Sequence, residues 1–97
     1  MAHYLITYDN RPPRNYQALY KLLESWRAVR LAESVWLAEL KGPASTIRTF
    51  VKQALQKGDL VAVIELKPGS DWATSCAKPT ATLWLSRNIH AAETSSG

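Results

Sequence analysis

Residues 59–66 restrict the fold more than any other part of the sequence, because they form a predicted strand that is apolar on both faces. Its two faces carry Leu60, Ala62 and Ile64 on one side and Val61 and Val63 on the other. Residues 34–40 have the same property, with Val35 and Leu37 on one side and Trp36, Ala38 and Leu40 on the other. Strands of this kind lie in sheets that are covered on both faces. The sequence therefore predicts a layered fold around a buried sheet.

Two amphipathic helices and two further strands complete the pattern before residue 66. Residues 3–8 alternate as a strand does, and the prolines of the following loop end that strand. Asn15 is suited to cap a helix that fades near Arg27 or Ala28, and a second helix covers residues 45–57. The apolar stripes of the two helices are Tyr16, Leu19, Tyr20, Leu23 and Trp26 in the first and Ile47, Phe50, Val51, Ala54 and Leu55 in the second. Residues 28–31 are suited to a short strand that pairs back on residues 34–40.

The segment after residue 66 is open to two interpretations. Residues 80–85 alternate as in a strand, but Pro79 as the first residue of a short helix fits equally well, and we favour the helix. Trp72, in the turn before this segment, is the aromatic residue that is hardest to assign to a core. Residues 91–97 are predicted to form a flexible tail.

The order of these elements predicts an α+β fold, a ferredoxin-like βαββαβ sandwich with a short C-terminal helix, in a single domain over residues 1–90. Two helices cover one face of such a sheet. The second face then needs the C-terminal segment, a second subunit or both. Because the chain has only 97 residues, and therefore a small core, we expect a homodimer.

The basic residues are concentrated near the N-terminus. Twelve Lys and Arg against eight Asp and Glu give a net charge of +4, and most of the excess falls within residues 1–30. The candidates for a surface that contacts the phosphates of RNA or DNA are Arg11, Arg14, Arg27 and Arg30. The alternative for these residues is a solvated helix face with ion-pair partners such as Glu24. The charge excess permits a polyanionic partner without requiring one.

The sequence has the features of a cytoplasmic protein with no membrane partner. Cys76 is the only cysteine, so no intramolecular disulfide can form, and the N-terminus has no basic segment followed by an apolar stretch. The longest apolar run, residues 60–64, is far shorter than the roughly 20 residues of a membrane-spanning helix. The two histidines, His3 and His90, lie outside any nucleophile or zinc motif.

Asp9 is the leading candidate for a functional residue. It follows the first predicted strand, where a side chain is held by a rigid element and still reaches solvent. A carboxylate in this position can bind Mg²⁺, which prefers oxygen ligands and takes few of them from protein. Asn10 adds a neutral oxygen, and Arg11 and Arg14 could hold a phosphate nearby. The alternative is that Asp9 and Asn10 only shape a turn before Pro12.

The order and spacing of these motifs resemble the CRISPR-associated protein 2 superfamily. An apolar strand that ends in Tyr8-Asp9, a Ser-Val-Trp strand start at residues 34–36 and the apolar strand at residues 59–66 carry the resemblance. The chain is more closely similar to the SinR-like bacterial branch, through a Trp-Ala turn at residues 72–73 and a Trp-Leu helix at residues 84–85. The virulence-associated protein D ribonucleases are more distant relatives.

The resemblance implies a ferredoxin-like homodimer in antiviral defence, acting as a metal-dependent endonuclease on RNA or DNA. In that family the strand-end aspartate, here Asp9, lies near its twin across the dimer axis and is proposed to hold Mg²⁺ or Mn²⁺. Asn10 and Ser34 are the auxiliary residues of this expected site. The alternative is a non-catalytic dimeric module that binds nucleic acid or another protein. A turn and a helix replace the family's partner-crossing C-terminal strand, so an integrase-type partner is not expected.

Overall fold

The computed structural model describes residues 1–9, 11 and 15–90, and within these it has four strands and three helices. In chain order they are β1 (Ala2–Tyr8), α1 (Gln17–Ser25), β2 (Val29–Ala32), β3 (Val35–Leu40), α2 (Ala44–Gln53), β4 (Val61–Leu66) and α3 (Pro79–Asn88). The strands form one sheet in the order β2-β3-β1-β4, and every neighbouring pair is antiparallel. The predicted α+β class is confirmed.

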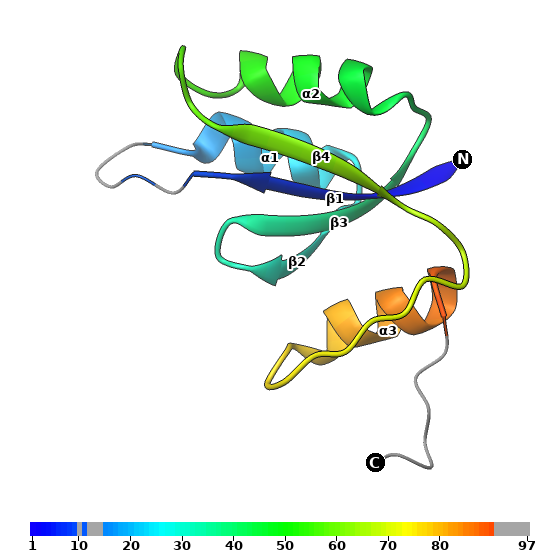
Figure 1. Cartoon of the computed structure of the whole chain (residues 1–97). Helices are drawn as coiled ribbons and strands as arrows, with labels where there is room; N and C mark the ends of the chain where they lie inside the picture. The colour runs from blue at the N-terminus through cyan, green and yellow to red at the C-terminus, as the bar shows by residue number, and fades with distance from the viewer. Residues whose placement is uncertain (10, 12–14, 91–97) are drawn as a thin grey trace.

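The helices lie on both faces of the sheet. Figure 1 shows α1 and α2 on one face and α3 on the other. The larger core lies under α1 and α2, because alternate residues of β1 point toward these helices. Its fully buried members include Ile6 from β1, Leu19 and Leu23 one turn apart on α1, and Val51 from α2.

The second face is covered by α3, so the predicted C-terminal helix and its first residue, Pro79, are both confirmed. Ala81 and Leu85 of α3 are buried in a second apolar cluster with Leu37 of β3. Trp72 also packs against this cluster, and its indole Nε1 donates to the His90 carbonyl oxygen at 2.7 Å. The core on this face therefore includes the tryptophan that the sequence pattern left unassigned.

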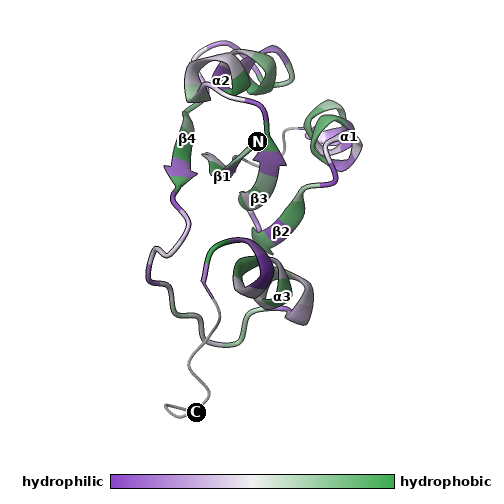
Figure 2. Cartoon of the chain, turned by 90° about the vertical axis from the view of Figure 1, so that its right-hand side faces the viewer, coloured by the Kyte–Doolittle hydropathy of each residue, from purple (hydrophilic) through white to green (hydrophobic). Residues whose placement is uncertain are grey.

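Within a single chain, residues 59–66 are not covered on both faces, because the cover that the C-terminal segment provides does not extend to β4. β4 is an edge strand, and the side chains of Leu60 and Ile64 are 56% and 54% exposed. Figure 2 shows the reason, since α3 lies beneath β2 and β3 rather than beneath β4. Only Leu66 of β4 reaches the second cluster. A strip of apolar surface therefore remains along this edge.

The first two helices, α1 and α2, are shorter than their apolar stripes predict. Asn15 does accept a hydrogen bond from the backbone N–H of Gln17 at 2.9 Å, but α1 ends at Ser25, and Arg27 follows in the left-handed region at φ 58°. The second helix, α2, ends at Gln53 rather than at Lys57. Phe50, placed on its buried stripe by periodicity, is half exposed, and its ring contacts Trp26 edge to face. Among the described residues, no helix combines the length and apolar character needed to cross a membrane.

Candidate functional site

Asp9 lies directly after β1, a central strand of the sheet, and Tyr16 hydrogen-bonds to its backbone and to that of Arg11. The hydroxyl of Tyr16 donates to the Asp9 carbonyl oxygen at 3.1 Å and accepts from the backbone N–H of Arg11 at 2.7 Å. The Asp9 side chain is 44% exposed, and its Oδ2 accepts a hydrogen bond from Arg11 Nε at 2.8 Å. The sequence therefore placed Asp9 correctly at a strand end, with a guanidinium as its neighbour.

The chemistry available at Asp9 is set by this ion pair. A divalent cation would compete with the Arg11 guanidinium for Oδ2. The described part of the chain contains no group of three or more His, Cys, Asp or Glu that could hold a metal ion. The further ligands of a cation at Asp9 would therefore have to come from substrate phosphates or from a second chain. Asn10, the expected auxiliary ligand, lies outside the described residues.

Arg30, on β2, is held in place by two aromatic rings and a carbonyl group. Its Cζ lies 5.0 Å from the centre of the Tyr20 ring and 5.2 Å from that of Trp36. Nε donates to the Glu33 carbonyl oxygen at 3.1 Å, and Nη2 donates to the same oxygen and to the Tyr20 hydroxyl. Within the described residues Nη1 has no acceptor, so one edge of a well-positioned guanidinium remains available to a ligand.

A row of aromatic rings runs from the end of β1, next to Asp9, to Arg30. Successive rings of Tyr8, Tyr16, Tyr20 and Trp36 have centres between 5.5 and 6.2 Å apart. The Tyr8 hydroxyl accepts from Trp36 Nε1 and donates to the Glu33 carbonyl oxygen, each at 3.4 Å. Burial raises the pKa of Tyr8 above its ordinary value. These aromatic residues are structural supports for the two polar positions rather than an exposed stacking surface.

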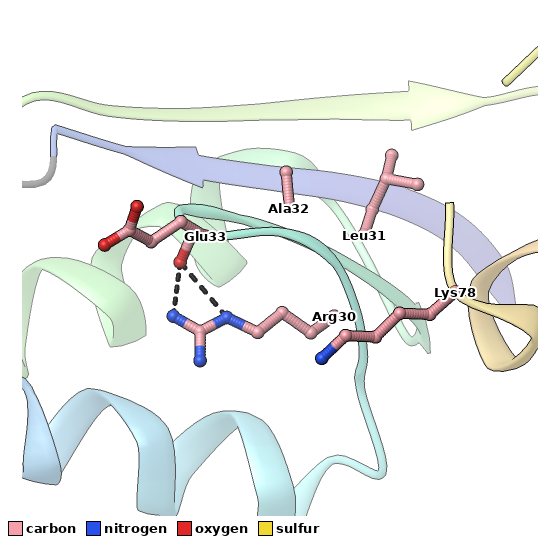
Figure 3. Close-up of a pocket in the computed structure, with 5 residues that line it drawn as sticks. All are labelled: Arg30, Leu31, Ala32, Glu33 and Lys78. Atoms are coloured by element: carbon pink, nitrogen blue, oxygen red, sulfur yellow. Dashed lines mark hydrogen bonds between the residues drawn. The ribbon is translucent and has the colours of Figure 1, made fainter. Parts of the chain in front are cut away.

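Arg30 also lines a pocket at the outer edge of the sheet (Figure 3). The pocket has a volume of about 320 Å³, and its lining residues are Arg30, Leu31, Ala32, Glu33 and Lys78. Lys78 is the residue directly before α3 and is far from Arg30 in the sequence. Sequence reasoning missed Lys78, and no local pattern could have found it, because only the docking of α3 beside β2 brings it there.

The remaining predicted site residues do not join this pocket. Arg27 is exposed where α1 ends, and its backbone N–H donates to the Glu24 carbonyl oxygen at 2.9 Å. The Ser34 carbonyl oxygen accepts from the backbone N–H of Tyr8 at 3.2 Å, which makes Ser34 part of the β1–β3 pairing. Arg14 lies outside the described residues. The predicted arginines therefore occupy separate positions, with Arg11 beside Asp9 and Arg30 beside Lys78.

Comparison of the chain with protein-family models, curated proteins and solved structures gave no match. Its function is therefore inferred from the geometry of these two positions.

Proposed function

We propose that the protein binds the phosphate backbone of RNA or DNA at the pocket that Arg30 and Lys78 line. The observation that carries this proposal is the meeting of two cations from distant parts of the chain in one hollow. Stacking holds the Arg30 guanidinium in place with Nη1 available, and a planar guanidinium suits a phosphate. Lys78 adds a mobile point charge. Both residues recognise phosphate without regard to base sequence.

Salt dependence and a charge-matched variant test this proposal. Lys78→Ala should weaken binding of a short RNA or DNA duplex by about 3- to 10-fold and reduce the slope of log affinity against log salt by about one. Lys57→Ala is the control, since it removes the same charge from an exposed turn beyond α2. Equal losses in both variants, or an affinity that ignores salt, would contradict the assignment of the pocket.

Membership of the CRISPR-associated protein 2 superfamily, in its SinR-like branch, is part of this proposal. The Tyr8-Asp9 strand end and the strand order β2-β3-β1-β4, with α1 and α2 together on one face, support a ferredoxin-like fold. The exposed apolar strip along β4 supports a homodimer. A cytoplasmic role in antiviral defence follows from the family resemblance alone.

The second candidate function is metal-dependent cleavage of RNA or DNA, with Asp9 as the ligand of Mg²⁺ or Mn²⁺. It is favoured by the exposure of the Asp9 carboxylate at the end of a central strand. A bound cation would supply charge neutralisation and an activated water. Arg11 would then leave Oδ2 and could hold a phosphate oxygen. The family arrangement further requires two Asp9 side chains at one dimer axis.

Cleavage assays with Mg²⁺ and Mn²⁺ separate the two functions. If Asp9 binds the metal, Asp9→Ala and Asp9→Asn should each abolish cleavage while leaving the affinity for uncleaved nucleic acid within about twofold. Cleavage that persists unchanged in both variants would remove Asp9 from the mechanism. A protein that binds with the expected salt dependence but does not cleave would leave the phosphate-binding proposal as the function.

A further inference from the structure

The outer edge of β4 presents a row of backbone groups that the sheet does not use. The backbone N–H of Asp9 donates to the Leu60 carbonyl oxygen at 3.4 Å, which places these two residues in a hydrogen-bonded pair of the antiparallel β1–β4 ladder. Alternation then directs the backbone groups of residues 62, 64 and 66 toward β1. The groups of Val61, Val63 and Glu65 therefore point away from the sheet.

This edge has few of the features that usually protect an exposed strand, and its charged pair, Glu65 with Lys67 at 3.2 Å, lies at the C-terminal end of β4. Within the described residues, no backbone hydrogen bond joins Val61, Val63 or Glu65 to another element, and β4 pairs with β1 without a bulge. Residues 61–66 contain neither proline nor lysine. Figure 2 shows β4 at the margin of the sheet, with no other strand or helix along its outer side. Such an edge is suited to pair with another strand.

We infer that two copies of this chain join through their β4 strands, antiparallel, with Val63 on the two-fold axis. A two-fold axis normal to the sheet leaves each side chain on the same face of the sheet in both copies. An odd-numbered residue of β4 must therefore lie opposite an odd-numbered residue of the partner, and an even-numbered residue opposite an even-numbered one. With Val63 opposite itself, Val61 lies opposite the partner's Glu65, and all three outward-facing residues form hydrogen-bonded pairs. The result is one continuous eight-stranded sheet.

The charges beside β4 favour this register. Arg48 of α2 lines a hollow of about 130 Å³ with Val63, and Lys52 is exposed one turn further along the same helix face. Glu65 Oε2 lies 3.2 Å from Lys67 Nζ of its own chain, and opposite Val61 the partner's Glu65 would in addition approach the side of β4 on which Arg48 lies. Moving the axis to Ala62 would instead set Asp59 opposite the partner's Glu65, and two carboxylates repel. Moving the axis to Ile64 would pair Val63 with the partner's Glu65. Val61 would then no longer pair with any of the three outward-facing residues, Val61, Val63 and Glu65.

The exposed apolar side chains also become paired in this register. Leu60 lies opposite the partner's Leu66, and Ile64 lies opposite the partner's Ala62, on the same face of the sheet as α3 but in the part beneath β4 that α3 does not reach. Cross-strand apolar pairs stabilise a sheet and remove both exposed side chains from water in part. A second copy of the chain therefore accounts for both the unused backbone groups and the apolar strip.

This dimer also separates the two Asp9 carboxylates. Asp9 is level with Leu60, three residues from the axis, so the two copies lie more than about 20 Å apart at opposite ends of the paired strands. A metal site shared by both Asp9 side chains, as the second candidate function requires, is therefore incompatible with this dimer, and the two arrangements exclude each other. The inference does not rest on phosphate binding, because the Arg30 pocket lies at the opposite edge of the sheet.

A cysteine scan tests the register. In a Cys76→Ser background, which removes the exposed native thiol, single cysteines are placed at Val61, Val63 and Glu65. Residues opposite each other in a hydrogen-bonded pair have Cα atoms about 5.5 Å apart, within the range of a disulfide. Val63→Cys should form a covalent dimer on oxidation, whereas Val61→Cys and Glu65→Cys should do so only when mixed. Cross-linking of Val61→Cys or Glu65→Cys alone, or no cross-linking of Val63→Cys, would overturn the register.

A charge exchange tests the interface without cysteines. Sedimentation of the wild-type chain should show a dimer in equilibrium with the monomer. Glu65→Arg alone, and Arg48→Glu with Lys52→Glu, should each raise the dimer dissociation constant at least about tenfold, while an equimolar mixture of the two should restore it. Glu24→Arg on α1 is the control for net charge and should leave the dissociation constant unchanged. A monomer at all concentrations, or a mixture that stays dissociated, would overturn the inference.

Discussion

At the scale of single residues, Arg30 shows how neighbours decide what a charged side chain does. In the sequence it is one of several basic residues near the N-terminus. In the fold its guanidinium lies against the rings of Tyr20 and Trp36 and donates to the Glu33 carbonyl oxygen. Arg30 therefore stabilises the β2–β3 turn and at the same time lines the pocket.

Replacement of Arg30 should reveal its structural role. Arg30→Lys keeps the charge but loses the planar stacking and the paired donors to Glu33, so we expect the free energy of unfolding to fall by about 1–3 kcal/mol. Arg27→Lys, at an exposed position after α1, should change it by less than about 0.5 kcal/mol. Urea denaturation of both variants provides the comparison, and equal losses would show that Arg30 is not held as described.

Tyr8 should give the protein a specific alkaline pH dependence. Burial raises its pKa above the ordinary 10.0, so the folded chain keeps the phenolic proton at pH values where the unfolded chain loses it. The contribution of the protonated Tyr8 to the free energy of unfolding is fully present below about pH 10 and is lost as the pH rises through the raised pKa of the folded state. In Tyr8→Phe, stability measured between about pH 8 and 11 should therefore fall less steeply above pH 10. Identical slopes for both proteins would contradict this assignment.

At the scale of elements, α3 decides how much of the second face is buried. Ala81 and Leu85 pack against Leu37, and the Trp84 ring meets the His3 ring edge to face at 5.5 Å. His3 Nε2 in turn lies 3.0 Å from Glu39 Oε2, so a histidine that lies outside any catalytic or zinc motif takes part in docking the helix. The same docking brings Lys78 to the pocket beside Arg30.

Two leucines of α3 should respond differently to truncation. Leu85 is 5% exposed in the second cluster, and Leu85→Ala should lower the free energy of unfolding by about 2–5 kcal/mol. Leu83 is 50% exposed, and Leu83→Ala should change it by less than about 0.5 kcal/mol. Thermal and urea unfolding measure both, and similar losses would mean that α3 docks through a different face.

At the scale of the whole molecule, the exposed strip on β4 should control self-association rather than folding. Ile64 is 54% exposed, so Ile64→Thr, which keeps a β-branched side chain, should change monomer stability by less than about 0.5 kcal/mol. It should raise the dimer dissociation constant by several-fold, because the partner's Ala62 would pack against a hydroxyl. Leu83→Gln is the matched control on α3. Light scattering at several protein concentrations measures the dimer dissociation constant of both variants. An unchanged dissociation constant in Ile64→Thr would contradict a role of the β4 strip in self-association.

Much of the secondary structure could be predicted because its signals are local. The alternation in residues 3–8, the turn between β2 and β3 and Pro79 at the start of α3 are each visible within a few residues. Asp9 could be found for the same reason, since it follows directly after β1. The length of α2 and the exposure of Phe50 could not be predicted in this way. The apolar stripe of a helix does not determine how much of that stripe the neighbouring elements will bury.

The sequence by itself determined the α+β class, the apolar character of the strands and the position of Asp9 at a strand end, because periodicity and neighbouring residues are sufficient for each. Only the tertiary structure decided that β4 is an edge strand, that α3 covers β2 and β3 instead, and that Lys78 stands beside Arg30. Those outcomes depend on which segments meet in space. An apolar strand has the same pattern at the centre of a sheet as at its margin, and only its neighbours make the difference.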